Sequence, residues 1–219
     1  MFEGATVELS GVDCTHGRRT VVRGVDLRIP GGERVALTGT NGSGKTTLLR
    51  AILGLHPLAG GTITVGGATA RTAQDWDLRR RAVAWIPQRQ AAGRFPLPAR
   101  ELLHSSGAFD AAMTAAHDLG VSSLAARPLH TLSGGQLQRM YLARALGCVA
   151  AGAGVLLADE PTAALDFAGQ EDAAKLLTDI PVTLLVVTHD RALAARCDRV
   201  LEMAGGSLRE ITSREEDAR

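Results

Sequence analysis

The chain has 219 residues and a mass of 22.9 kDa, enough for one sizeable α/β domain with a small insertion but too few for a second full domain. Its 24 basic and 23 acidic residues leave a formal net charge of +1, which excludes the strongly basic class of nucleic-acid-binding proteins. Cys14, Cys148 and Cys197 are widely separated and form no C-x-x-C pair, which argues against a disulfide framework or a zinc knuckle. We therefore expect a protein of the reducing cytosol without a nucleic-acid partner.

The sequence shows no pattern typical of a targeting signal or a membrane span. Met1 is followed by a polar, strand-like segment, so we expect no secretory signal. The most apolar stretch, 148–158, contains two glycines and ends at Asp159, which makes it too short to cross a bilayer. Any action at a membrane is expected to depend on a partner protein.

The first part of the chain is predicted to form three strands and a helix. Apolar and polar residues alternate along the first two strands, and a Pro-Gly-Gly turn precedes the third. Beyond a glycine-rich loop, apolar residues recur at the spacing of one helix face. The predicted strands are Thr6–Val12, Val21–Ile29 and Arg34–Thr38, and the predicted helix begins at Thr46.

The glycine-rich loop matches the pattern G-x-x-x-x-G-K-[ST], and it lies between a strand and a helix, as that pattern requires. Its glycines permit positive φ angles, and the N–H groups and dipole of the following helix attract phosphates. We expect Lys45 to contact the β- and γ-phosphates and the Thr46 hydroxyl to bind Mg²⁺. The sequence therefore predicts an ATP or GTP site. Its residues are Gly39, Thr40, Asn41, Gly42, Ser43, Gly44, Lys45, Thr46 and Thr47.

The next predicted elements are a strand at Thr62–Val65, a short helix over 75–81 and a buried strand at Ala82–Ile86. After them the sequence pattern becomes mostly helical. Between residues 89 and 131, prolines flank two helical patterns, Ala99–His104 and Phe109–Leu119. A structureless loop of that length is rare in a compact domain. We therefore predict a helical subdomain inserted over 89–131 and extending into a helix that starts near residue 133.

The rest of the chain alternates helices and strands, which predicts a largely parallel sheet covered on both faces. The predicted helices are Gly134–Ala150, Gly169–Leu177 and Arg191–Ala195, and the predicted strands are Val155–Ala158, Val182–Val187, Arg199–Met203 and Ser207–Ile211. A solvated tail is expected after Ser213. The predicted fold is thus one α/β domain, 1–219, with a mostly parallel sheet, antiparallel N-terminal strands and the helical insertion.

Two acidic residues end the apolar strand at Val155–Ala158. The carboxyl ends of parallel strands meet at the sheet edge where ligands of open α/β folds bind. Asp159 is therefore placed to hold Mg²⁺, and Glu160 to polarise an attacking water. Two capping carboxylates are the structural alternative, but a charge pair directly after so apolar a run is costly without a function.

A second anion site is predicted where the sequence LSGGQ opens a helix. Ser133 is a natural N-cap, and the glycines beside it leave the N–H groups of the first turn accessible. An ordinary helix start is the alternative. The residues are Ser133, Gly134, Gly135 and Gln136.

Two further polar residues follow predicted strands. The Gln88 amide is placed to contact Mg²⁺ or the attacking water, and the His189 imidazole to hydrogen-bond a γ-phosphate. A lone histidine at a strand end is more often structural, and only the order and spacing of the other motifs favour a functional role here.

With these motifs in this order, the whole chain resembles the ABC-type ATPases, which have the P-loop NTPase fold. Gly39–Thr46, Gln88, Leu132–Gln136, Val155–Glu160, Ala163–Asp166 and His189 are similar to the Walker A, Q-loop, signature, Walker B, D-loop and H-loop of that family. The resemblance implies ATP and Mg²⁺ as cofactors. It also implies a head-to-tail dimer in which the signature of one copy closes over the ATP held by the other.

The same resemblance implies roles for individual residues. Glu160 would be the catalytic base, His189 the γ-phosphate contact and Asp166 a link between the two copies. The aromatic residue that stacks on adenine in the family corresponds to His16, whose smaller ring predicts weaker and less selective binding of the base. Thr40 replaces a frequent proline, which should matter little because that position contributes backbone.

The commonest task of the family is to power a transporter. We expect a separate membrane permease, with or without a substrate-binding protein, and a location on the cytoplasmic face of the membrane. The segment 93–103 and the short chain resemble ATPases of zinc and manganese importers. The alternatives are a haem or drug exporter ATPase and a non-transport ABC ATPase acting on ribosomes or DNA.

Overall fold

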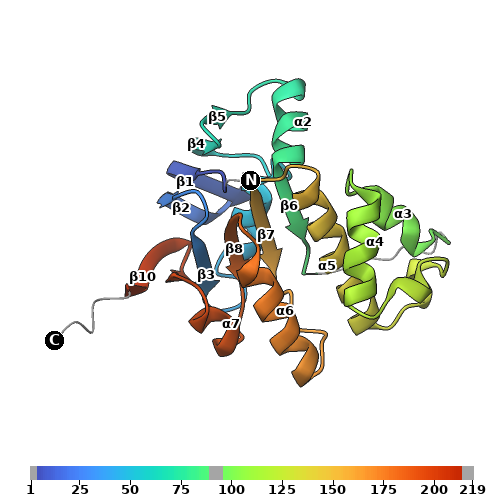
Figure 1. The fold of residues 1–219 in the computed structure, drawn as a ribbon. Coiled ribbons are helices and arrows are strands. Elements are labelled where there is room, and N and C mark those ends of the chain that lie inside the picture. Colours follow the sequence, from blue (N-terminus) through green and yellow to red (C-terminus); the bar gives the residue numbers. More distant parts are fainter. Residues whose placement is uncertain (1–3, 89–95, 214–219) are drawn as a thin grey trace.

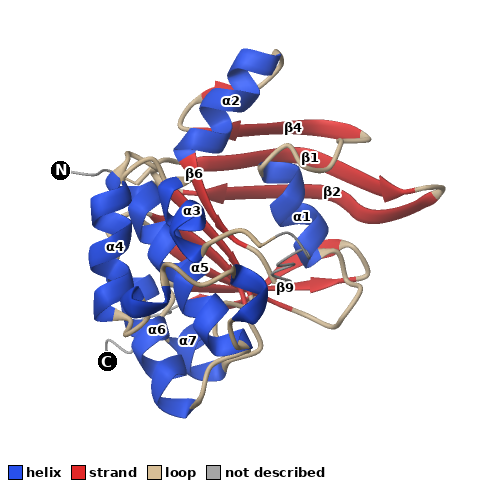
Figure 2. Ribbon diagram, turned by 90° about the vertical axis from the view of Figure 1, so that its right-hand side faces the viewer, coloured by secondary structure: helices blue, strands red, loops and turns tan. Residues whose placement is uncertain are grey.

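The computed structural model describes residues 4–88 and 96–213 and contains two β-sheets with helices around them (Figures 1 and 2). The strands are β1 (Val7–His16), β2 (Arg19–Ile29), β3 (Arg34–Thr38), β4 (Gly60–Val65), β5 (Ala68–Thr69), β6 (Val83–Ile86), β7 (Val155–Asp159), β8 (Thr183–Val187), β9 (Arg199–Ala204) and β10 (Ser207–Ser213). The helices are α1 (Lys45–Ile52), α2 (Ala73–Ala82), α3 (Ala99–His104), α4 (Phe109–Asp118), α5 (Gly134–Ala150), α6 (Phe167–Asp179) and α7 (Arg191–Ala195), with short 3₁₀ turns η1 (Ser122–Leu124) and η2 (Leu129–Thr131).

The larger sheet has six strands in the order β10-β9-β3-β8-β7-β6. Neighbours from β9 to β6 run parallel, and only β10 pairs antiparallel, as a hairpin with β9. This confirms the predicted α/β fold. The parallel order also brings the carboxyl ends of β3, β7 and β8 to one sheet edge, where the predicted site residues begin.

The smaller sheet is antiparallel, with the order β2-β1-β4-β5. Strand β1 continues to His16, beyond the predicted end at Val12, because register shifts after Leu9 carry the pairing past Gly11, whose φ is 55°. Such bulges interrupt the alternation of apolar and polar residues from which the strand was predicted. Strand β2 likewise begins at Arg19, so a short turn joins the two strands.

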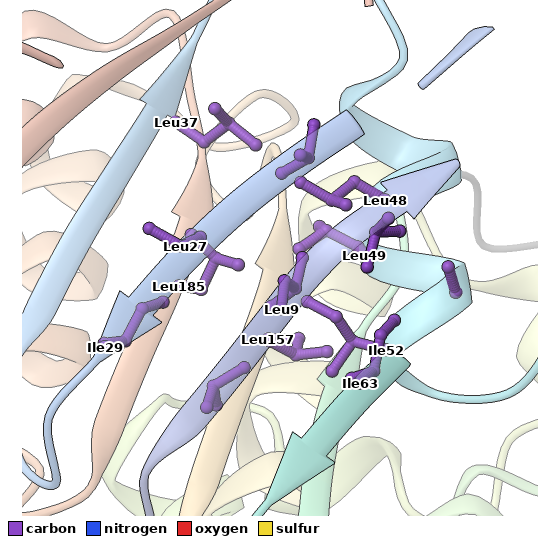
Figure 3. Packing of buried hydrophobic residues seen from close by; sticks show 14 of the residues in the cluster. Leu9, Leu27, Ile29, Leu37, Leu48, Leu49, Ile52, Ile63, Leu157 and Leu185 are labelled. Carbon is purple, nitrogen blue, oxygen red and sulfur yellow. The ribbon is translucent and has the colours of Figure 1, made fainter. Parts of the chain in front are cut away.

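The strands of the parallel sheet bury both faces. In β7, Val155 and Leu157 face the cluster shared with α1 and the smaller sheet, whereas Leu156 and Ala158 face the cluster shared with α5, α6 and α7. Figure 3 shows Leu157 in the first cluster, together with leucines of α1 and β1. The phosphate-loop helix is therefore held between two sheets.

A third hydrophobic cluster joins α3, α4 and the first half of α5, and it includes Leu103, Ala116, Met140 and Ala143. In Figure 1 these helices lie at the opposite side of the molecule from β10. Both helices predicted in the insertion are present, but residues 89–95 of the predicted subdomain lie outside the described residues. The described part of the chain contains no helix long and apolar enough to span a bilayer.

Candidate functional site

The phosphate loop follows β3 and ends at Gly44, which caps α1 with a φ of 111°. Gly39 has a φ of 131°, and a Cβ there would lie 2.2 Å from the carbonyl oxygen of Met203. At Gly44 a Cβ would lie 2.5 Å from the carbonyl oxygen of Val21. Both positions therefore require glycine for the backbone conformation and for the close packing of the loop.

Lys45 extends back across the loop that it terminates. Its Nζ donates to the carbonyl oxygens of Gly39 at 2.6 Å and Thr40 at 2.9 Å, and the residue is 7% exposed. Burial lowers the pKa of Lys45, although Glu160 and Asp159 act in the opposite direction. The loop thus presents a partly desolvated cation beside two carboxylates.

Asp159 lies at the end of β7 and is 1% exposed. Its Oδ2 accepts a hydrogen bond from the Thr46 hydroxyl at 2.7 Å, whereas its Oδ1 is buried without a hydrogen-bond partner among the described residues. Burial, the largest influence, raises the pKa of the Asp159 carboxyl, and Thr46 and Lys45 oppose that shift. An unpartnered carboxylate oxygen beside a hydroxyl is a donor set suited to Mg²⁺, so these residues fit the predicted ion.

Glu160 is the one non-glycine residue in the described part of the chain with a positive φ, 52°. Its backbone N–H donates to the Val187 carbonyl at 2.9 Å, which ties the strained residue to β8. Its carboxylate lies 3.4 Å from His189 Nε2 and accepts from the His189 backbone N–H at 3.3 Å. Burial raises the pKa of Glu160, while His189 acts against that rise.

Lys45, Thr46, Asp159 and Glu160 line one cavity of about 570 Å³, which we call the nucleotide cleft, whereas His189 contacts Glu160 without lining that cavity. Asn41, Gly42, Gly44, Lys45, Thr46 and Thr47 of the loop line it together with His16, Gln88, Asp159 and Glu160. Gly39 and Thr40 contribute their carbonyl oxygens to Lys45, and Ser43 is buried. Gln88 is exposed, just beyond β6, on the same wall as Asp159.

His16 occupies the end of β1 at this cleft. Its Nε2 lies 3.3 Å from the Thr47 hydroxyl, and its ring meets His56 edge-to-face with centroids 4.8 Å apart. Sequence reasoning missed His56, which follows α1 in a loop with no periodic pattern. Its proximity to His16 arises only when α1 packs against the smaller sheet.

The LSGGQ residues lie at the N-terminus of α5, where Ser133 and Gln136 form a reciprocal capping box. Ser133 and Gly134 are exposed, and a Cβ on Gly135 would lie 3.1 Å from the carbonyl oxygen of Ala164. Asp166 caps α6 through Gly169 N–H at 3.2 Å. The sequence did not identify this capping role, which makes α6 begin at Phe167, two residues before its predicted start.

We call Ser133–Gln136 with Ala164–Phe167 the signature face. Asp166 forms an ion pair of 3.4 Å with Arg139, which follows the first segment on α5, so the helices that carry the two segments are linked. Phe167, which comes directly after Asp166, is 84% exposed. None of these residues lines the nucleotide cleft of the same chain, as far as the described residues show. The structure thus brings together the predicted residues of the cleft and leaves the signature face outside it.

Comparisons with known proteins identify the family of this chain. A family model described as ABC transporter matches residues 22–163, which includes the phosphate loop, Gln88, the signature and Glu160. The chain is 40% identical over 209 residues to the haemin import ATP-binding protein HmuV of Nocardia farcinica, covering 87% of this chain and 69% of that protein. It is 36% identical over 213 residues to the zinc transport system ATP-binding protein TroB of Treponema pallidum, covering 89% and 77%.

A third relative is much longer than this chain. The pyoverdine export ATP-binding/permease protein PvdT of Pseudomonas syringae is 36% identical over 230 residues, covering 95% of this chain but only 34% of that protein. The names of these relatives include haemin, zinc and pyoverdine transport, so the comparisons do not establish the predicted zinc or manganese substrate.

Solved structures show the same fold. The dimeric structure of MJ0796, titled a bacterial ABC transporter cassette, superposes with a TM-score of 0.85 at 27% identity, covering 96% of this chain and all of that one. A dimeric post-hydrolysis state of MJ0796 bound to ADP and Pi has a TM-score of 0.84. The chain therefore belongs to the ABC transporter family and is an ATP-binding cassette with ATPase function.

Proposed function

We propose that this chain hydrolyses ATP at a site shared by two copies and that hydrolysis powers a separate membrane permease. The proposal rests on one observation, that the nucleotide cleft and the signature face of one chain are separate. The N–H groups of a helix first turn have no partner within the helix, and at this helix start Gly134 is exposed and Gly135 is half-buried. A head-to-tail pair places this helix start over the nucleotide held by the other copy.

Two observations support burial of the signature face by a second copy. Phe167 is 84% exposed at the end of the segment that carries Asp166, an exposure that is unusual for so large an apolar side chain. The MJ0796 cassettes, which this chain resembles over 96% of its length, are dimeric. We propose that Phe167 and Asp166 contact the second copy.

The chemistry follows from the residues of the cleft. Lys45 and the loop N–H groups hold the β- and γ-phosphates, and His189 donates to a γ-phosphate oxygen. The Glu160 carboxylate accepts a proton as water attacks the γ-phosphorus, the bond to the bridging oxygen breaks, and ADP and phosphate are released. Thr46 and Asp159 would hold Mg²⁺, with Gln88 beside them. When bound, that ion neutralises charge that develops on the phosphates.

A second cavity, of about 520 Å³, supports a membrane partner. It lies between the phosphate-loop core and the helical subdomain, and its floor includes Leu53, Val83 and Trp85. Three arginines, Arg80, Arg81 and Arg144, line it, and its described lining contains no carboxylate. We propose that an acidic, amphipathic segment of the permease docks here. The chain would then act on the cytoplasmic face of the membrane.

For the transported substrate we propose metal import of the zinc or manganese type, with a substrate-binding protein outside the membrane. The 36% identity to the zinc transport protein TroB supports this. Haem import is the second candidate, because the haemin import protein HmuV is 40% identical. Export and non-transport roles are the remaining alternatives.

Co-expression with a candidate permease provides the test. Co-expression should yield a membrane complex in which ATP turnover rises when the correct substrate, zinc, manganese or haemin, is offered with its binding protein. Charge reversal at Arg80 and Arg81 should release the chain from the membrane fraction. A stable complex with ribosomes, and none with the permease, would contradict the transport role.

A further inference from the structure

Two histidines that are far apart in the sequence meet at the wall of the nucleotide cleft. His16 closes β1, and His56 lies in the loop after α1. Their ring centroids are 4.8 Å apart with planes inclined at 63°, an edge-to-face contact. Aromatic rings in this geometry attract each other beyond the area that they bury.

Hydrogen bonds fix both rings. The His56 Nε2 lies 3.1 Å from the Thr15 carbonyl oxygen, and because a carbonyl only accepts, this nitrogen must carry the hydrogen. The His16 Nε2 lies 3.3 Å from the Thr47 hydroxyl on α1. Pairing of His16 with Arg19 across the β1–β2 turn holds the backbone. An exposed imidazole is therefore held in one orientation beside the phosphate loop.

We propose that His56 is a positioning residue that holds His16 as a preformed stacking surface for the base of the bound nucleotide. This rests on the proposed ATP site in the cleft. An imidazole offers less stacking area than a phenol, so its contribution depends on how little side-chain freedom is lost on binding. The contact with His56 removes that freedom before the nucleotide arrives.

The proposed contacts of the phosphates are Lys45 and the N–H groups of the loop. His56 contacts neither, according to the described hydrogen bonds and ring contacts. A change at His56 should therefore alter the affinity for a ligand that has a base and leave unchanged the affinity for a ligand that has only phosphates.

Calorimetric titration of wild type and His56→Ala with ATP and with inorganic tripolyphosphate, both in Mg²⁺, tests this. The substitution should weaken ATP binding about 3- to 10-fold, the range of one lost aromatic contact, and leave tripolyphosphate binding unchanged. His56→Phe, which keeps a ring against His16, should restore most of the lost affinity. His117→Ala, at an exposed position of α4, is the matched control.

Three results would overturn the proposal. Equal losses for both ligands would mean that His56 merely stabilises the loop. Unchanged ATP affinity in His56→Ala would mean that it does not position His16. Failure of His56→Phe to restore affinity would exclude the ring contact as the cause. If wild type bound neither ligand, the proposed ATP site itself would be wrong, an outcome distinct from these three.

Discussion

In the nucleotide cleft, Lys45 and Asp159 are 7% and 1% exposed, and one oxygen of Asp159 has no described hydrogen-bond partner. On the signature face, Ser133 and Gln136 satisfy each other in a capping box, and Asp166 caps its own helix. The cleft thus holds desolvated charge that a ligand would compensate. The signature face satisfies its own helix caps and presents backbone N–H groups, the exposed Phe167 ring and the exposed Asp166 carboxylate.

The two regions therefore have different roles in the proposed ATPase cycle. Buried charge lowers the stability of the empty cleft and favours binding of a charged ligand. A self-capped helix end is rigid before it meets its partner, so little order has to be gained on closure. Substitutions in the cleft should therefore impair chemistry or binding, whereas those on the signature face should impair association.

Glu160→Gln should have the largest effect, because it removes the proposed base while keeping the shape of the side chain. We expect ATP turnover to fall by on the order of 10² to 10⁴ and an ATP-bound dimer to accumulate. Steady-state phosphate release and size-exclusion chromatography with ATP measure these two effects. Glu101→Gln, at an exposed position of α3, is the control, and undiminished turnover in Glu160→Gln would remove Glu160 from this role.

Lys45→Ala should abolish tight MgATP binding, since it removes the cation that reaches the phosphates. A loss of on the order of 100-fold is expected from charge-assisted hydrogen bonds of this kind. Isothermal titration calorimetry gives the affinity. The chain has one other lysine, Lys175, which is exposed on α6, and Lys175→Ala should bind as wild type does. Wild-type affinity in Lys45→Ala would contradict the phosphate-loop assignment.

Asp159→Asn tests whether the cleft is destabilised by buried charge. Burial raises the folded-state pKa of Asp159, so the folded protein binds more protons than the unfolded chain between the two values, and stability falls as pH rises through that range. At pH 7 the substitution should therefore raise the melting temperature without nucleotide by about 2–4 °C, while weakening the effect of Mg²⁺ on ATP binding.

The gain should vanish at a pH below the ordinary pKa of an aspartate, where Asp159 is protonated in both states. Thermal unfolding at a series of pH values measures it, with the exposed Asp172→Asn as control. Lower stability of Asp159→Asn at pH 7 would contradict the proposed destabilisation of the cleft by the buried charge of Asp159.

Ser133→Ala should have the smallest effect on a single copy. Loss of the N-cap costs about 1 kcal/mol of unfolding free energy, measurable by urea denaturation, and should leave ATP binding to the monomer unchanged. The exposed Ser10→Ala should leave the unfolding free energy unchanged. A large loss of ATP affinity in monomeric Ser133→Ala would place the signature in the cleft of its own chain and contradict the separation of the two regions.

Most of the fold was predictable because its elements follow local patterns. The apolar runs of β3 and β7, the helical pattern of α5 and the motif at Gly39–Thr47 indicate their structures directly. Capping was less visible: the pair Thr72 and Asp75 starts α2 at Ala73, before the predicted helix. That signal is present in the sequence, although a single pair of polar residues is weak evidence.

Features that depend on tertiary structure were not predictable. The positive φ of Glu160 results from its hydrogen bond to Val187 on the neighbouring strand. The contact between His16 and His56 requires α1 to pack against the smaller sheet. For the site, the sequence indicated candidate residues, but not the backbone strain, the burial and the additional contacts that hold them in place.

Mixing two defective variants shows whether each ATP site is made from two copies of the chain. Lys45→Ala keeps an intact signature, and Ser133→Arg, with a bulky cation at the cap, keeps an intact nucleotide cleft. Each should be inactive alone, whereas an equal mixture should recover roughly a quarter of wild-type ATP turnover, because half of the dimers contain one complete site. A mixture as inactive as its components would contradict a head-to-tail shared site.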